Sequence, residues 1–139
     1  MAGAFHLRVL TPRRPLFEVE AVSVIAPGSD GYLGILANHA PLITALVPGK
    51  LTIRNAEGLQ TVFAVSSGFL EVSNNNVTML VDSAELPGDI DVQRARRARD
   101  RARDRLADTN AEIDRARAEG SLARAINRIR VAAELGQTG

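Results

Sequence analysis

Arginine side chains near both ends of the second half of the sequence could bind an anion. Asp91 and Arg94 stand near its start. Arg124 and Arg128 lie one helical turn apart near its end. The rigid guanidinium group donates paired hydrogen bonds to phosphate oxygens. If this half of the chain folds back on itself, the four groups meet, and the pattern favours a site for a polyphosphate such as ATP.

The turn between two helices decides whether these groups meet. Gly120-Ser121 offers one break in the helical pattern, and Asp108-Thr109-Asn110 offers another. Thr109 and Glu112 have the spacing of a capping box, which begins a helix. A glycine inside a helix costs only about 1 kcal/mol relative to alanine. We therefore place the turn near Thr109 and keep Gly120 within the second helix.

The turn near Thr109 predicts which residues face each other across an antiparallel hairpin. At about 1.5 Å of rise per residue, Arg94 is nearly level with Arg124. Asp91 is nearly level with Arg128 on the same basis. Facing guanidinium groups repel one another, and an anion between them would relieve this repulsion. Binding would then stabilise the folded hairpin, so that ligand concentration is read as a conformational preference.

Two simpler interpretations compete with this site. Asp91 alone is typical of a helix N-cap, because it follows a glycine-containing turn and precedes a long Ala/Arg segment. An arginine stripe is commonly a solvated face paired with acids. The stripe on the first helix consists of Arg94, Arg97, Arg101 and Arg105, and its available partners are Asp100, Asp104, Asp108 and Asp114.

The composition indicates a globular chain with two different halves. The 139 residues are 45% hydrophobic, with no Cys and no Trp, which excludes disulfides and thiolate metal sites. Little aromatic content argues against stacking on single-stranded nucleic acid. No apolar run has the length of a membrane span, and no signal-peptide pattern opens the sequence. Residues 1–88 carry a net charge of −2 and the remainder +3, which supports a two-part chain.

The first half has the alternation and turns of an antiparallel sheet protein. Asn-rich and Gly-containing turns at residues 55–58 and 73–76 indicate hairpins. The segment Leu42–Val47 has a proline on each side and fits either a buried strand or a bend. The predicted strands are residues 5–10, 19–26, 32–36, 50–54, 61–65, 69–72 and 77–81.

Pro87-Gly88 marks the boundary between the halves, since no proline follows it. Small residues at helical spacing then predict two helices with narrow seams. The predicted seam of the first helix is Ala95, Ala98, Ala102 and Leu106, and that of the second is Ile113, Ala116, Gly120, Ala123 and Ile126, running on to Ile129 or Arg130. The fold class is therefore α+β: an antiparallel β-sandwich or flattened barrel at residues 1–86, followed by an antiparallel two-helix hairpin at residues 87–139.

No residue set predicts catalysis. His6 and His39 are far apart, without metal-ligand spacing. Ser66-Ser67-Gly68 has no nearby His/Asp partner, and no phosphate-binding P-loop is present. We expect no catalytic residue and no metal site. A basic helix could contact nucleic acid, but acids interleave with its arginines, so a nucleic-acid adaptor remains only a distant alternative.

Three collinear passages carry a resemblance to a known family. They are GYLGILANHAPL at residues 31–42, SGFLEV at 67–72 and NVT at 76–78. With the helical tail that follows them, the chain resembles the epsilon subunit of the bacterial F-type ATP synthase along nearly its whole length. The resemblance implies an N-terminal β-sandwich followed by a C-terminal helix hairpin.

The resemblance also implies a role and partners. The chain would be a non-catalytic rotor subunit of the central stalk, on the cytoplasmic face of the bacterial plasma membrane, held to the membrane only through the complex. The sandwich would bind the gamma subunit and the c-ring. The loop of Asp30, Gly31 and Tyr32, with His39 nearby, would face the c-ring. The extended hairpin would reach the catalytic alpha and beta subunits and inhibit ATP hydrolysis.

Some members of that family bind ATP on the hairpin through an Ile/Leu-Asp-x-x-Arg-Ala motif, which residues 90–95 match. The resemblance implies that the adenine end is surrounded by Glu85, Ile90, Asp91 and Ala95. It implies that the phosphates face Arg94, Arg101, Arg124 and Arg128. ATP would thus be a regulatory ligand, with no prosthetic group. The alternative is the same subunit without significant ATP binding, its hairpin held by helix packing alone.

Overall fold

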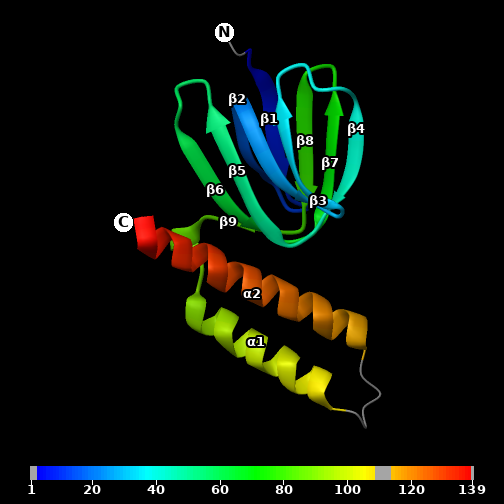
Figure 1. Ribbon diagram of the computed structural model, residues 1–139, viewed down its shortest axis with the longest axis vertical. Helices are drawn as coiled ribbons and strands as arrows, with labels where there is room; N and C mark the ends of the chain where they lie inside the picture. Colours follow the sequence, from blue (N-terminus) through cyan, green and yellow to red (C-terminus); the bar gives the residue numbers. More distant parts are fainter. Residues whose placement is uncertain (1–2, 109–113, 139) are drawn as a thin grey trace. The chain divides into compact units, whose positions relative to one another are not determined.

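The computed structural model describes residues 3–108 and 114–138. The chain divides into two compact units, Met1–Ala84 and Glu85–Gly139. Figure 1 shows that strands form the first unit and that two long helices dominate the second. Strands followed by a helical hairpin confirm the predicted α+β class.

The strands alternate buried and exposed residues, as the sequence pattern predicted. Residues 42–46, which fitted either a strand or a bend, form a strand. The described residues contain β1 (Phe5–Leu10), β2 (Pro15–Gly28), β3 (Gly31–Leu36), β4 (Leu42–Leu46), β5 (Gly49–Asn55), β6 (Gln60–Val65), β7 (Gly68–Ser73), β8 (Asn76–Val81) and β9 (Ala84–Glu85).

The long strand β2 belongs to both layers of the sandwich. Its first half pairs with β1 and its second half with β3 and β5, with a register shift between Ala21 and Ser23. The strand order is β1-β8-β7-β4-β2-β5-β6-β9, with β3 on β2 and an additional β1–β2 pairing. One pairing differs from the antiparallel prediction, because β1 and β8 run parallel.

Large apolar side chains from both layers fill the interior of the strand unit. Phe5, Leu7 and Val9 alternate inward from β1 and are fully buried. Leu51 and Ile53 do the same from β5. Burial of such side chains stabilises a fold by about 1.5–3 kcal/mol each. This interior therefore fixes the strand register, since a one-residue slip would turn the whole set outward.

Asparagine shapes the hairpin turns, as the sequence indicated. Asn74 and Asn75 between β7 and β8 have positive φ angles of 49° and 61°. The short polar side chain of asparagine tolerates this left-handed backbone region. In the β5–β6 turn, the Asn55 side-chain oxygen accepts hydrogen bonds from the backbone N–H groups of Glu57 and Leu59. These turns set the register of their strands.

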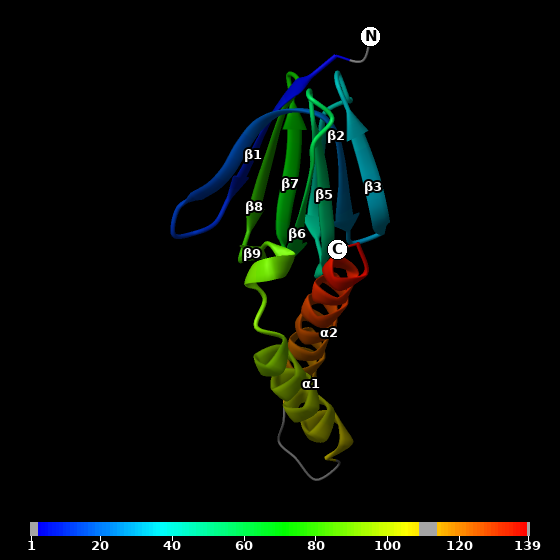
Figure 2. The same cartoon turned by 90° about the vertical axis from the view of Figure 1, so that its left-hand side faces the viewer.

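The second unit begins with a short 3-10 helix, η1 (Pro87–Asp89), followed by α1 (Val92–Ala107) and α2 (Arg115–Thr138). The two long helices run antiparallel and pack along their length (Figures 1 and 2). Gly120 lies inside α2, so the turn falls on the side of Thr109 rather than at Gly120. The proposed capping box of Thr109 and Glu112 lies outside the described residues. No helix in the described ranges is both long and apolar enough to cross a membrane.

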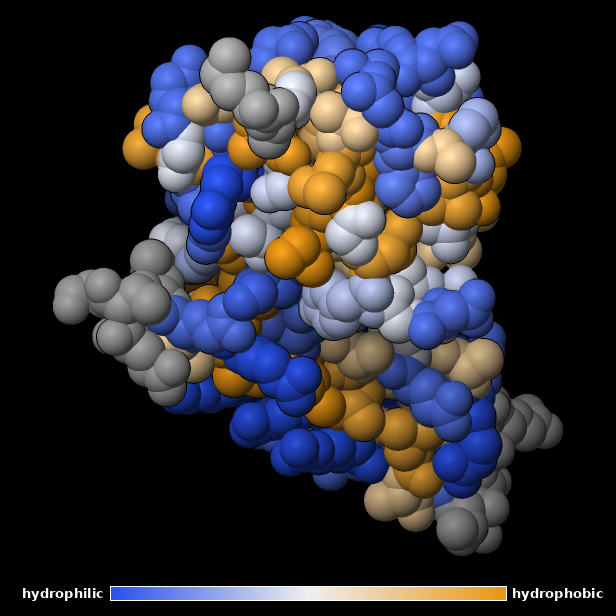
Figure 3. Space-filling model, turned by 45° about the horizontal axis from the view of Figure 1, so that its top comes forward, coloured by the Kyte–Doolittle hydropathy of each residue, from blue (hydrophilic) through white to orange (hydrophobic). Residues whose placement is uncertain are grey.

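The seam between the helices agrees with the prediction for α1 but not for α2. Ala95 and Ala102 of α1 are buried. In α2, Ala116 and Ala123 are exposed, whereas Ala118, Ala125 and Val131 are buried. Ile113, which was predicted to begin this seam, lies outside the described residues. Two alanine stripes run along α2 at helical spacing, and spacing alone does not distinguish them. Hydrophobic residues form narrow strips on the helical unit, whose visible surface is otherwise largely hydrophilic (Figure 3).

Candidate functional site

Asp91 begins α1 as its N-cap. It has an extended backbone, and its Oδ1 atom accepts a hydrogen bond from the backbone N–H of Arg94 at 3.0 Å. The first turn of a helix has free N–H groups, and a carboxylate there also interacts favourably with the helix dipole. The simpler interpretation of Asp91 as a cap is therefore confirmed. A carboxylate that caps the helix also fixes where Arg94 begins the arginine stripe.

The arginine stripe of α1 is not neutralised by neighbouring acids. Within residues 3–108 and 114–138, no carboxylate forms an ion pair with Arg94, Arg97, Arg101 or Arg105. Asp100 pairs instead with its neighbour Arg99 at 3.0 Å. All four stripe residues are exposed. The stripe therefore offers cationic groups that an external anion can reach.

Arg128 differs from the stripe because it has a carboxylate partner. Its Nε donates to Oε1 of Glu85 at 2.7 Å, and its Nη2 donates to Oε2 at 3.0 Å. The Arg128 and Glu85 side chains are 26% and 29% exposed, respectively. The short helix η1, two residues beyond Glu85, packs against α2. The Glu85–Arg128 pair thus connects the segment before α1 to the C-terminal half of α2.

Arg124 lies exposed on α2 and leans back along its own helix. Its Nη2 donates to the Ser121 hydroxyl at 3.2 Å. A Cβ atom at Gly120 would lie 3.2 Å from the Nη1 atom of Arg124. The missing side chain of Gly120 therefore leaves room for this guanidinium group. In the described ranges Arg124, like the stripe, makes no ion pair with a carboxylate.

The observed helix ends change which residues lie opposite each other across the hairpin by about one turn. The end of α1 at Ala107 and the start of α2 at Arg115 place the middle of the turn at position 111. Arg94 and Arg128 are each 17 positions from this point, so Arg94 lies opposite Arg128 rather than Arg124. Arg124 and Arg101 fall within the next two turns toward the loop. The four arginines therefore span about 10 Å along the hairpin axis, at about 1.5 Å of rise per residue.

Ile90 and Ala95 serve packing in this structure. Both side chains are buried, Ala95 completely. Ala95 belongs to the seam that brings α1 close to α2. These two residues pack around the start of α1. The charged groups of the predicted site are the arginines, Asp91 and Glu85.

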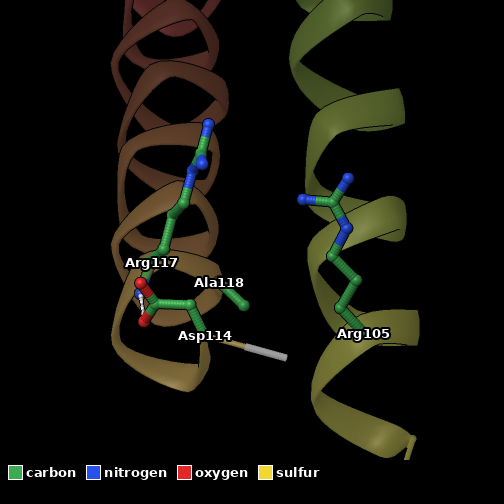
Figure 4. Close-up of a pocket in the computed structure, with 4 residues that line it drawn as sticks. All are labelled: Arg105, Asp114, Arg117 and Ala118. Carbon is green, nitrogen blue, oxygen red and sulfur yellow. Dashed lines mark hydrogen bonds between the residues drawn. The ribbon is translucent and has the colours of Figure 1, made fainter. Parts of the chain in front are cut away.

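A small cavity of about 320 Å³ lies elsewhere, toward the loop end of the hairpin, lined by Arg105, Asp114, Arg117 and Ala118. Figure 4 shows the guanidinium groups of Arg105 and Arg117 extending from the two helices away from the loop end. None of the eight residues predicted for the nucleotide site lines this cavity. The predicted residues and the cavity are separate features of the hairpin.

Two contacts near the loop were missed by the sequence analysis. Asp114 accepts a hydrogen bond from the backbone N–H of Arg117 at 3.0 Å and so caps the start of α2. Arg115 donates from Nη1 to the Leu106 carbonyl at 3.1 Å, near the end of α1. An aspartate directly before a helical segment is the signal that could have identified the cap. The carbonyl contact has no local sequence signal.

The residues predicted to face the c-ring are not all together. Asp30 and Gly31 form the exposed tip between β2 and β3, where Gly31 has a φ angle of 122°. The hydroxyl of Tyr32 accepts the backbone N–H of Lys50 at 2.9 Å. His39 follows the other end of β3, and its Nδ1 is 2.7 Å from the Ala40 carbonyl. The length of the strand therefore separates His39 from the tip, which corrects the expectation that it lies nearby.

Histidine and acidic side chains give no metal centre in the part of the chain that the structure describes. No three of them are grouped so that they could hold a metal ion there. His6 lies between Glu18 and Glu20 on the strand unit, with its ring nitrogens 2.7 Å and 2.9 Å from their carboxylate oxygens. These hydrogen bonds, first to Glu20 and then to Glu18, raise the pKa of His6.

Comparison with known families accounts for both units. Residues 4–87 match the family model described as ATP synthase, Delta/Epsilon chain, beta-sandwich domain. Residues 89–133 match the model described as ATP synthase, Delta/Epsilon chain, long alpha-helix domain. The two matches follow one another along the chain and cover the strands and the helical hairpin in turn.

Individual relatives and solved structures give the same result. The chain is 47% identical over 130 residues to the ATP synthase epsilon chain of Moorella thermoacetica, covering 94% of this chain and 97% of that one. It is 47% identical over 132 residues to that of Desulforamulus reducens, covering 95% and 99%. A chain in the cryo-EM structure of Euglena gracilis mitochondrial ATP synthase shares the fold, with a TM-score of 0.81 at 20% identity, covering 99% of this chain and 83% of that chain.

Proposed function

Because the chain belongs to the delta/epsilon chain family of ATP synthase, we propose that it is a non-catalytic rotor subunit in the central stalk of that complex. In this role it couples the gamma subunit to the c-ring. It works at the cytoplasmic face of the bacterial plasma membrane and is held there through the complex. The collinear match of both units to the family carries this assignment.

The strand unit offers a surface for the gamma subunit. Leu10, Leu80, Phe69 and Ala45 are neighbours across β1, β8, β7 and β4, and they point outward. Phe69 is 60% exposed, Leu80 48%, and the nearby Ile43 75%. Contiguous exposed apolar residues are typical of protein–protein contacts. We assign this row to the gamma subunit, and the hairpin tip of Asp30–Tyr32 to the c-ring.

A charge at the centre of this row tests the gamma assignment. Phe69→Asp is expected to weaken capture of the gamma subunit by at least tenfold, because a carboxylate would have to be desolvated in the contact. The matched control is Leu59→Asp, an exposed apolar residue in the β5–β6 turn. Equal loss for both variants would place the gamma contact elsewhere. Equilibrium binding of purified gamma to the full chain measures the effect.

The hairpin is proposed to bind ATP as a regulatory ligand. The observation that carries this proposal is the grouping of four arginines within about 10 Å along the hairpin axis. Three of them, Arg94, Arg101 and Arg124, have no carboxylate partner in the described part of the chain. A triphosphate chain has a comparable length and several negative charges. Its oxygens accept paired hydrogen bonds from guanidinium groups on both helices.

Such binding would act on the conformation of the hairpin. A ligand held by α1 and α2 together binds the folded hairpin and not an extended one, so it favours folding by mass action. The extended hairpin is proposed to reach the alpha and beta subunits and to inhibit ATP hydrolysis. High ATP would keep the helices folded and release the inhibition. Low ATP would permit extension.

Titration of the full chain with ATP tests the site. Arg94→Ala and Arg124→Ala are each expected to weaken binding about tenfold or more, because each removes charge-assisted hydrogen bonds. Arg96→Ala is the matched control, since Arg96 is exposed on the same helix outside the stripe. Calorimetry gives the affinity, and NMR shifts of the helices locate it. No shift at millimolar ATP would mean that helix packing alone holds the hairpin.

The regulatory step is tested in the assembled complex. With the Arg94→Ala chain, inhibition of ATP hydrolysis is expected to persist to higher ATP concentrations than with the unaltered chain. The Arg96→Ala complex should match the unaltered one. If all three complexes respond to ATP alike, regulation by this hairpin site is contradicted.

A further inference from the structure

The ligand-free hairpin already holds an anion on one of its proposed phosphate-binding arginines. That anion is the carboxylate of Glu85, bonded to Arg128 through both oxygens at 2.7 Å and 3.0 Å. The resemblance placed Glu85 at the base side of a nucleotide, yet here it occupies a phosphate-side residue. We infer that Glu85 is an internal competitor of the polyphosphate, and that the phosphates displace its carboxylate from the Nε–Nη2 edge of Arg128. This inference rests on the proposed ATP site.

The chemistry of the two anions makes the competition direct. A carboxylate and a phosphate each present two oxygens at a spacing that fits one guanidinium group. Arg128 uses both Nε and Nη2 for Glu85. The Nε–Nη2 edge of Arg128 cannot bond a phosphate in this way while the carboxylate holds it. At that edge, a bond to phosphate and the bond to Glu85 are therefore alternatives.

The charges around Arg128 favour Glu85 as its partner in the ligand-free hairpin and the phosphate chain in the bound hairpin. Arg94, Arg101 and Arg124 are exposed on the facing stretches of the hairpin, without carboxylate partners among the described residues. Glu85 compensates only Arg128 and adds one negative charge. A triphosphate can bond several of these arginines at once. Without ligand the internal carboxylate limits repulsion at Arg128, and with ligand the phosphate chain replaces it.

The pair also connects the site to the segment that precedes α1. Glu85 and Arg128 are 43 positions apart, and between Glu85 and α1 lie η1 and the cap Asp91. Releasing Glu85 therefore frees the start of this segment from the side chain of α2. Ligand binding would change the restraint on residues 85–91 as well as the charge on Arg128. Nucleotide binding would thus also affect residues 85–91, which precede α1.

Removal of the competing charge is the direct test. Glu85→Gln keeps the shape of the side chain but loses the ion pair. It should tighten binding of ATP and of inorganic triphosphate to the full chain by about five- to tenfold, because an ion pair no longer has to be broken. Asp89→Asn is the matched control: it removes one negative charge four residues away, outside the pair. It is expected to change affinity less than about twofold, since a separated exposed charge is screened.

A second variant separates competition from a change in folding. Arg128→Lys keeps the positive charge but removes the paired donors. On this background, Glu85→Gln should no longer change triphosphate affinity. The Nε–H resonance of Arg128 should shift on Glu85→Gln without ligand, and also on triphosphate addition to the unaltered chain. Helical circular dichroism of each variant checks that the hairpin is formed.

The possible results distinguish this inference from the proposed function. Tighter triphosphate binding by Glu85→Gln, with little change for Asp89→Asn, supports the competitor. If the unaltered chain binds ATP and Glu85→Gln binds it equally or more weakly, the competitor is overturned while the ATP site stands. If neither chain binds ATP or triphosphate at millimolar concentration, both proposals are overturned.

Discussion

The strand unit and the helical unit have different kinds of interior. The strand unit buries Leu, Ile, Val, Phe and Met side chains completely. The described part of the helical seam buries mainly alanines, of which Ala95 and Ala125 are the most enclosed. A buried methyl group contributes about 0.8 kcal/mol, against about 1.5–3 kcal/mol for a buried Leu, Ile, Val or Phe side chain. The strand interior therefore contributes far more stability per residue than the helical seam.

This difference suits a fixed scaffold joined to an element that changes state. Small side chains let α1 and α2 approach closely, but their separation exposes little apolar surface. Among the described residues, two polar contacts lie near the ends of the hairpin: Arg115 with the Leu106 carbonyl, and Glu85 with Arg128. A ligand that contributes a few kcal/mol can decide such an equilibrium.

Truncation of a core residue should cause the largest loss of stability, and this loss should be confined to the strand unit. Leu51 is fully buried in β5, and Leu51→Ala is expected to cost about 2–5 kcal/mol through lost burial and the cavity left behind. Leu59→Ala is the matched control, since Leu59 is exposed in the following turn. The free energy of unfolding from denaturant titration measures both. Similar losses for the two would contradict the assigned core.

Enlarging a seam alanine tests the helical side of the comparison. Ala125→Leu should cost about 1–3 kcal/mol, because the three additional carbon atoms of leucine cannot fit where α1 and α2 touch. Ala123→Leu, two positions earlier on the exposed face, should have little effect. Thermal unfolding followed by helical circular dichroism distinguishes them. The opposite order would restore the seam that the sequence analysis predicted.

The strand fold was largely predictable, and its exceptions have physical causes. Alternation of apolar residues located the strands, and Asn74 and Asn75 located a turn by their tolerance of positive φ. The segment 42–46 stayed ambiguous because its flanking prolines fit a strand end or a bend equally well. The parallel pairing of β1 with β8 joins segments about seventy residues apart, where no local pattern records direction. The two-residue β9 is too short to leave a pattern.

The candidate site was predictable as a set of residues but not as a set of contacts. Helical spacing identified Asp91 and the arginines, and it correctly favoured a turn before Gly120. It did not specify which alanine stripe of α2 faces α1, because both stripes have the same period. Nor did it predict that Glu85 bonds Arg128, since two side chains 43 positions apart meet only through the packing of η1 on α2.

Loss of the α1 cap should have a moderate effect on the helical unit alone. Asp91→Ala leaves a first-turn N–H group without its partner and is expected to cost about 1 kcal/mol of hairpin stability. Asp104→Ala, on the exposed face of the same helix, is the control. The comparison uses helical circular dichroism during thermal unfolding without ligand. If the two variants unfold alike, Asp91 does not stabilise α1 as a cap.

The smallest expected effect belongs to the surface of the strand unit and depends on pH. Hydrogen bonds to Glu20 and Glu18 raise the pKa of His6 above its usual 6.5. A raised folded-state pKa means that the protonated ring is favoured in the folded chain. Its contribution is therefore fully present below the unfolded pKa and is lost as the pH rises through the folded one. His6→Gln should lower the Tm more at about pH 5.5 than at about pH 8.5, where both chains lack the charged ring.

The cause of the raised His6 pKa can be tested by following the His6 ring in a Glu20 variant. Glu20→Gln should lower the NMR titration midpoint of the His6 ring, because it removes the principal hydrogen-bond acceptor. Glu71→Gln, an exposed carboxylate on β7, should leave the midpoint unchanged. Because these carboxylates are exposed, high salt should reduce the shift. An equal loss of Tm for His6→Gln at both pH values would show that His6 stabilises β1 and β2 by contact rather than charge.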